Sequence, residues 1–199
     1  MFSKKIENFW YYHKTKVIVI AFLIIFIAIS WDFNRSQYIE LEIAYVLEDQ
    51  VISWEGMQEV NQIFESVLQK EDDEIEGIQF TPLQGAMIDY QIAMPSAHIF
   101  LVDDKTLEKY IDIVLFEPLD HYVEKYNIDI SNHPEIIVDS KDTDGIVYAL
   151  PFKKLKFLVD YGFPEYDYYF TIRIPHDNTY DIRGNENAHT ILKYILDNS

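Results

Sequence analysis

One uninterrupted apolar run near the N-terminus limits what this chain can fold into more than any other feature. Val17 to Ile29 contains no polar side chain, and Trp10 and Trp31 lie on either side of it. The run alone is shorter than the about 20 residues that usually span a bilayer. Counted from Trp10 to Phe33, however, a helix would be roughly 36 Å long, and its terminal aromatic residues suit the two membrane interfaces. We therefore expect residues 1–33 to form a cytoplasmic lead and a transmembrane helix, with residues 17–31 in contact with lipid.

The charge of the N-terminal lead predicts the orientation of this helix. Residues 1–16 carry four lysines against one glutamate, a net charge of +3. Positive charge before a spanning helix favours a cytoplasmic N-terminus, which predicts a single-pass protein of the cell membrane with its C-terminal domain outside the cell. A cleaved signal peptide is the alternative, because Ala28-Ile29-Ser30 offers small residues at the right spacing for cleavage.

The remainder of the chain is strongly acidic and contains no cysteine. The whole chain has a net charge of −18, so the residues after the lead carry −21. A domain with this charge would repel nucleic acid, whose binding requires basic surface. The absence of cysteine excludes disulfides, thiolate catalysis and cysteine-rich zinc sites.

Residues 34–199 show strand and helix patterns in alternation, after a short polar stalk. A helix from Ser53 as N-cap to about Gln69 has its apolar residues three and four positions apart, with Gly56 as an irregularity. Three further helices are expected. One spans Lys105–Ile111, the next ends at about Tyr126, and the last spans Asn185–Leu196. Strands are expected at Tyr38–Leu47, Ile75–Leu83, Met87–Met94, His98–Val102, Glu135–Val138, Gly145–Leu150 and Tyr166–Ile174. This alternation predicts an α/β domain with one open mixed sheet flanked by helices.

Several of these segments, in this order, resemble bacterial extracellular solute-binding proteins (periplasmic binding proteins), two-lobed receptors that deliver sugars or peptides to membrane importers. The opening strand, helix and strand, LEIAYVL, MQEVNQIFESVLQ and IEGIQFTPL, resemble the start of that family. PSAHIFLVDDKTLEKYIDIVLFEPLDHYV is similar to its signature of a strand, an acidic turn and a helix, with His98 in place of the usual aspartate. DGIVYALPF resembles the strand that approaches the hinge of the family.

The departure from the family concerns its second lobe. The resemblance implies more than a hundred further residues after the hinge, yet Tyr161 and Phe163 are followed almost at once by the returning strand and the closing helix. We therefore expect one lobe on a membrane tether. A single lobe cannot close around a small solute, so its exposed rim suits a protein surface or a polymer better.

Seven residues near the expected rim are candidates for contact with a ligand or partner: Trp54, Asp103, Asp104, Phe152, Tyr161, Tyr166 and Tyr168. Three of them belong to an aromatic group that serves either core packing or recognition, because alternate strand residues face opposite ways. The members of this group are Tyr161, Phe163, Tyr166, Tyr168, Tyr169 and Phe170. Asp142-Thr143-Asp144-Gly145 is similar to half of a calcium loop, but the full loop would need acidic residues where Ser140 and Pro151 stand, so a solvated turn is expected. His98 is expected to be a packed histidine.

No cofactor, metal or catalytic motif stands out in the sequence. We therefore predict a non-enzymatic extracytoplasmic binding or interaction module, partnered by a membrane or envelope protein beside a transporter or envelope complex, with a sugar or peptide solute as a further ligand. One alternative is a receptor of an importer that completes its cleft with another chain. An envelope enzyme with an unrecognised site is the other.

Overall fold

The computed structural model describes residues 2–34, 39–46, 53–68, 77–93, 95–111, 115–140, 143–163, 168–177 and 179–199, which fall into two compact units, Met1–Tyr38 and Ile39–Ser199. The first unit is the helix α1 (Phe2–Asn34). Its segment Trp10–Ile27 is long and apolar enough to cross a membrane, and none of it is buried. A single-pass anchor and an N-terminal signal sequence share these properties. The expected N-terminal apolar helix is thus present.

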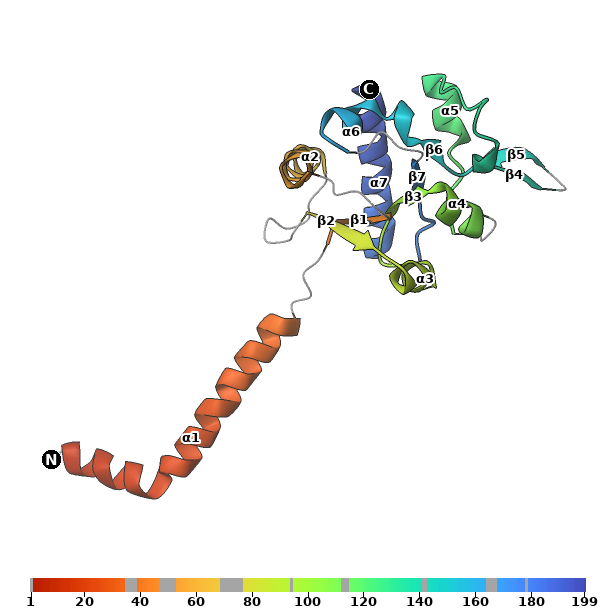
Figure 1. The fold of residues 1–199 in the computed structure, drawn as a ribbon. Coiled ribbons are helices and arrows are strands. Elements are labelled where there is room, and N and C mark those ends of the chain that lie inside the picture. Colours follow the sequence, from red (N-terminus) through yellow and green to blue (C-terminus); the bar gives the residue numbers. More distant parts are fainter. Residues whose placement is uncertain are drawn as a thin grey trace. The chain divides into compact units, whose positions relative to one another are not determined.

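The second unit is built on a five-stranded mixed sheet with the strand order β2-β1-β3-β7-β6 (Figure 1). β1 (Leu41–Val46) pairs in parallel with both β2 (Ile78–Leu83) and β3 (Ile99–Asp103). β7 (Tyr168–Ile172) runs antiparallel to β3 and to the two-residue strand β6 (Leu150–Pro151). The predicted α/β class with a mixed sheet is confirmed. β2 also contains Pro82, which was expected to end it and which an edge strand tolerates.

Helices cover both faces of this sheet, so its central strands are buried on both sides. In β1, Leu41, Ile43 and Tyr45 join one core cluster, whereas Ala44 and Val46 join another. β3 alternates in the same way, as expected for side chains of period two. The first cluster packs under α2 (Trp54–Val67), α6 (Lys156–Asp160) and α7 (Thr179–Asp197), and the second under α3 (Ala86–Ala93) and α4 (Asp104–Tyr110).

The helix α2 confirms the predicted cap and explains its irregular glycine. The Ser53 side chain accepts a hydrogen bond from the backbone N–H of Gly56 at 3.4 Å. A Cβ atom at Gly56 would lie 1.9 Å from the backbone oxygen of Tyr161. The helix therefore needs glycine at this position because the chain after α6 passes directly against it.

The strand predicted at Met87–Met94 is wrong, because α3 occupies this segment. Ile88 and Ile92 lie four residues apart and both pack on the second core cluster, which is the spacing of one helix face. Asp89 on the same helix accepts hydrogen bonds from Lys109 and Tyr110 of α4. These contacts hold the segment as a helix against α4. A short apolar pattern in the sequence does not reveal such contacts.

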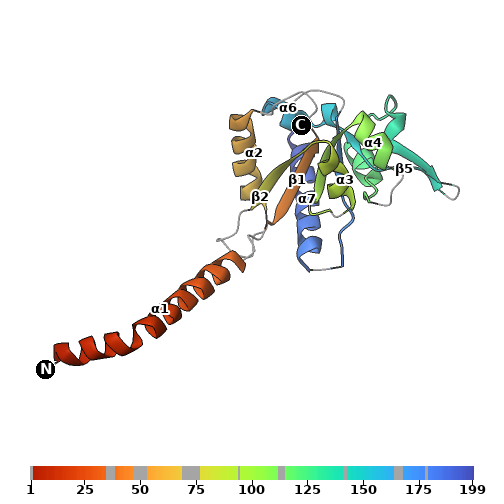
Figure 2. The same ribbon diagram turned by 60° about the horizontal axis from the view of Figure 1, so that its bottom comes forward.

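The helix predicted to end at about Tyr126 is present, but two 3-10 helices and α6 were not predicted. The strand predicted at Glu135–Val138 begins as a 3-10 helix, and the single strand predicted at Gly145–Leu150 is wrong, because its two ends belong to different sheets. α5 (Asp120–Tyr126), the 3-10 helices η1 (Pro134–Ile136) and η2 (Phe152–Lys154), and the antiparallel hairpin of β4 (Ile137–Ser140) and β5 (Thr143–Val147) lie between α4 and β7. This hairpin projects away from the five-stranded sheet (Figures 1 and 2). α7 begins six residues before the predicted Asn185. Tyr166, Asp142 and the acidic segment 71–74 lie outside the described residues.

Candidate functional site

The structure brings the six described candidates from the sequence to one edge of the sheet, where the parallel strands end. Asp103 ends β3 and stands opposite Tyr168, the first residue of the antiparallel strand β7. Trp54 begins the helix that follows β1, and Phe152 directly follows β6. Tyr161 adjoins the N-terminus of α2 through its contact with Gly56. Asp104 begins α4. Ligands of open α/β sheets usually bind at this carboxyl edge.

The aromatic candidates differ in how exposed they are. Phe152 is buried and packs against Phe163, with ring centroids 6.1 Å apart. Tyr161 and Tyr168 are half-buried against the first core cluster. Trp54 is 70% exposed. Among the described members of the group, core packing is therefore the main use, and Trp54 is the aromatic candidate that is open to a partner.

A cavity of about 650 Å³ opens at the same edge beside the end of β3. It lies where α4, the loop before η1 and β7 meet. Its volume falls within the range of small-molecule sites. It is lined by Asp104, Glu108, Ile111, Asn132, His133, Glu135 and Tyr169.

Tyr169 occupies the buried side of this cavity and links two of its other residues. The Tyr169 hydroxyl donates a hydrogen bond to Oε1 of Glu135 at 2.5 Å, and Nδ1 of His133 lies 2.9 Å from the same oxygen. The rings of Tyr169 and His133 meet edge to face. A phenol, a carboxylate and an imidazole thus form one short chain of polar contacts.

Burial and hydrogen bonding set the protonation states of Tyr169 and Glu135. Burial, followed by hydrogen bonding to the carboxylates of Glu135 and Asp104, raises the pKa of the Tyr169 hydroxyl far above its usual range. For Glu135, burial acts in the opposite direction, but hydrogen bonds from Tyr169, from its own backbone and from His133 leave its pKa below the usual value. At neutral pH the tyrosine therefore keeps its proton and the glutamate stays ionised.

The lining of the cavity has a negative charge. Asp104, Glu108 and Glu135 supply carboxylates, and none of the seven described lining residues is a lysine or an arginine. Ile111 adds an apolar wall. A positively charged group with an apolar stem would match this lining, whereas an anion would be repelled.

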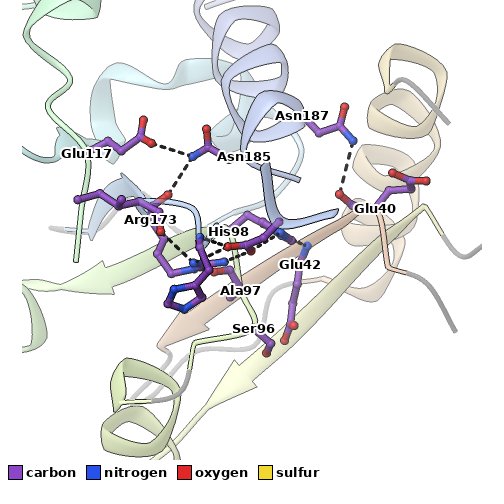
Figure 3. A network of polar contacts seen from close by, with 12 residues as sticks. Glu40, Glu42, Ser96, Ala97, His98, Glu117, Arg173, Asn185 and Asn187 are labelled. Atoms are coloured by element: carbon purple, nitrogen blue, oxygen red, sulfur yellow. Dashed lines mark hydrogen bonds and ion pairs between the residues drawn. The ribbon is translucent and has the colours of Figure 1, made fainter. Parts of the chain in front are cut away.

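A second polar network lies at the opposite, amino edge of the parallel strands (Figure 3). Arg173, which is 1% exposed, pairs with Asp181 and donates from Nε to the backbone oxygen of Ala97 at 2.7 Å. Asn185 bridges Glu117 and the backbone oxygen of Arg173, at 3.0 and 2.9 Å (Figure 3). These contacts fasten the start of α7 to the sheet. Because most of its buried polar groups pair with one another, with Oε2 of Glu40 as an exception, we assign this network to structure.

His98 is the packed histidine that the sequence predicts, and it belongs to this second network. Its Nδ1 accepts the backbone N–H of Glu42 at 3.2 Å, and its Nε2 lies 3.3 Å from Asp181. Burial, with the nearby Arg173 charge, lowers the pKa of His98 to about 4, so the ring is neutral at physiological pH. Gly184 of α7 packs directly against this ring.

The described residues form no metal site, and the comparisons identify no family for the chain. Within the part of the chain that the structure describes, no three His, Asp or Glu side chains are arranged to hold a metal ion. No family model matches the chain, and no curated protein matches it either. The resemblance to solute-binding proteins therefore stays a prediction.

Sequence reasoning found Asp104 but missed the other residues of the cavity. Glu108 and Ile111 lie in the segment that resembles the family signature but were not selected, and Asn132, His133 and Glu135 come from a segment without a recognisable motif. Tyr169 was included only as a member of the aromatic group. One available signal was that His133 and Glu135 flank a proline at a turn.

Proposed function

We propose that this protein is a membrane-tethered, non-enzymatic binding module whose α/β domain works outside the cytoplasm, beside a membrane or envelope protein. The carboxyl edge of its sheet is the binding surface. The observation that carries the proposal is the ligand-sized cavity at that edge, in a chain whose other unit is a helix apolar enough to span a membrane.

The arrangement of the domain supports binding at an open edge. Residues 39–199 form one compact unit with a single five-stranded sheet. The resemblance to one lobe of a solute-binding protein agrees with such a unit. Because a lone lobe has no opposing lobe to exclude water, a partner that brings its own surface gains more from this edge than a small free solute.

The protonation states in the cavity favour binding over proton-transfer chemistry. The raised pKa of Tyr169 keeps its hydroxyl from acting as a nucleophile or a base near neutral pH. The lowered pKa of Glu135 makes it a poor general acid there. Both groups therefore act as fixed hydrogen-bonding and charged features of the lining.

The membrane placement is tested with single-cysteine variants, because the natural chain contains no cysteine that would react. Ser3→Cys marks the lead, and Glu186→Cys marks an exposed position on α7. In intact bacterial cells whose outer layers admit the reagent, a membrane-impermeant maleimide should label Glu186→Cys, and Ser3→Cys only after the membrane is opened. The protein should also keep its full length in the membrane fraction. The reverse labelling pattern, or a shortened soluble product, would refute a retained anchor with this orientation.

Binding at the carboxyl edge is tested by crosslinking in cells. A photo-crosslinker on Glu108→Cys, at the cavity, should give a discrete crosslinked partner, and one on Lys193→Cys of α7 should not. Melting of the purified full chain in lipid nanodiscs with sugars and peptides separates the importer-receptor alternative. A rise of several degrees with one solute class would favour that receptor over an interaction module.

A further inference from the structure

We propose that the cavity at the end of β3 binds an alkylammonium or alkylguanidinium group, either on a small free amine or on a lysine or arginine side chain of a partner. This inference rests on the proposed binding function and specifies the chemistry of its ligand. Three features of the cavity carry it: its size, its excess of carboxylates over cationic groups, and its apolar wall.

The cavity is large enough to hold a ligand. About 650 Å³ is many times the volume of one water molecule, and it lies within the range of sites that enclose small molecules. The cavity also sits at the carboxyl edge of the sheet, where open α/β domains bind their ligands.

Carboxylates outnumber cationic groups in the lining around Tyr169. Tyr169 is 2% exposed, and its hydroxyl donates to Glu135 at 2.5 Å, with Nδ1 of His133 2.9 Å from the same oxygen. Asp104 and Glu108 line the same cavity, and an ionised carboxylate is an acceptor only. A ligand with several N–H donors and a positive charge complements these two carboxylates.

The chemistry of the walls narrows the ligand further. Glu108 adds a third carboxylate, and Ile111 gives an apolar surface along which an alkyl stem can lie. Lysine and arginine combine such a stem with a cationic head. An anionic ligand would meet three like charges. A neutral sugar would bring no positive charge to Asp104 and Glu108.

Calorimetric titration of the full chain in phosphatidylcholine nanodiscs tests this inference. The probes are agmatine, a free dication with an alkylguanidinium at one end and an alkylammonium at the other, the peptide acetyl-Gly-Arg-Gly-amide, and its norleucine analogue as a neutral control. Binding of agmatine together with the peptide shows that the cationic group suffices. Binding of the arginine peptide alone shows that the group must be presented by a chain. Either result, with no binding of the norleucine peptide, supports the proposal.

Variants decide whether binding takes place in the cavity. Asp104→Asn with Glu108→Gln neutralises two exposed rim positions without removing volume, and should weaken binding about five- to tenfold. Glu135→Gln, which removes the half-buried charge, should weaken it by tenfold or more. Glu186→Gln changes an exposed carboxylate on α7 and serves as the matched control, with binding unchanged. Raising the salt concentration should weaken binding in every case.

Two results would overturn the inference. One is that neither agmatine nor the arginine peptide binds. The other is that Glu186→Gln weakens binding as much as the two rim substitutions do, which would mean general attraction to an acidic domain. In both cases the labelling and crosslinking experiments still test the proposed function, because their results do not depend on a cationic ligand.

Discussion

For the substitution Gly184→Ala, two physical effects predict changes of opposite sign in the free energy of unfolding. Gly184 lies inside α7, where replacing glycine with alanine normally stabilises a helix by about 1 kcal/mol. In this protein a Cβ atom at position 184 would lie 2.1 Å from Nε2 of His98 and 2.5 Å from two carbon atoms of the ring. Carbon atoms in contact are normally about 3.5–4.0 Å apart. The ring must therefore move by more than about 1 Å.

The cost of that movement follows from what holds the ring. His98 would lose its contacts with the Glu42 backbone N–H and with Asp181, at about 1 kcal/mol for each hydrogen bond. Overpacking of a filled site adds about 1–3 kcal/mol. After the gain in helix propensity, we expect the free energy of unfolding to fall by about 2–4 kcal/mol. For a domain of this size that lowers the melting temperature by about 10 °C.

A double-mutant cycle with His98→Ala tests the explanation. Once the ring is absent, Gly184→Ala should be neutral or stabilise the protein by up to about 1 kcal/mol, which gives a coupling of at least about 2 kcal/mol between the two positions. The assay is urea unfolding of the full chain in mild detergent, followed by the near-ultraviolet circular dichroism of its tyrosines. A stabilising effect of Gly184→Ala in the natural background would refute the reasoning, as would an equal loss in both backgrounds.

Three further predictions follow from other contacts. Because the pKa of His98 is about 4 in the folded protein against 6.5 unfolded, the unfolded chain binds the extra proton between these values. The free energy of unfolding should therefore be highest above pH 6.5 and fall by up to about 3 kcal/mol towards pH 4, and a His98→Gln variant should show a flatter urea-midpoint profile. Gly56→Ala should destabilise the domain by about 2–4 kcal/mol through its clash with the Tyr161 backbone oxygen, whereas the exposed Glu59→Ala should leave the melting temperature within a few degrees. Tyr169→Phe should cost about 1 kcal/mol and move the pKa of Glu135 up towards its ordinary value, as followed by NMR titration; an unchanged Glu135 titration would contradict the hydrogen bond.

The sequence predicted those parts of the fold that depend on local pattern. An apolar run located β3, a partly alternating pattern located β1, and apolar residues three and four positions apart located α2, which Ser53 caps as expected. The pattern failed for α3, because its eight residues suit either a strand or a helix, and contacts with α4 determine the outcome. The early start of α7 depends on Gly184 fitting His98, a contact across 86 positions of the chain.

The candidate site was less predictable, because its residues meet only after folding. Asp104 follows a recognisable buried strand, so the rule that parallel strands end at one edge was enough to select it. His133 and Glu135 lie in a loop and a short 3-10 helix, and only the return of β7 places Tyr169 between them and α4. The spacing of these residues along the sequence does not predict that they come together.

The two outermost strands of the sheet would have a consequence if copies of the chain are held at one membrane, as proposed above. On one flank Pro82 interrupts the row of N–H groups in β2, and on the other β6 offers only two residues. Many copies held in one lipid layer would collide far more often than copies in free solution. Edge strands of this kind offer a neighbouring copy few free backbone groups for strand pairing. A high local concentration therefore need not lead to aggregation through edge strands.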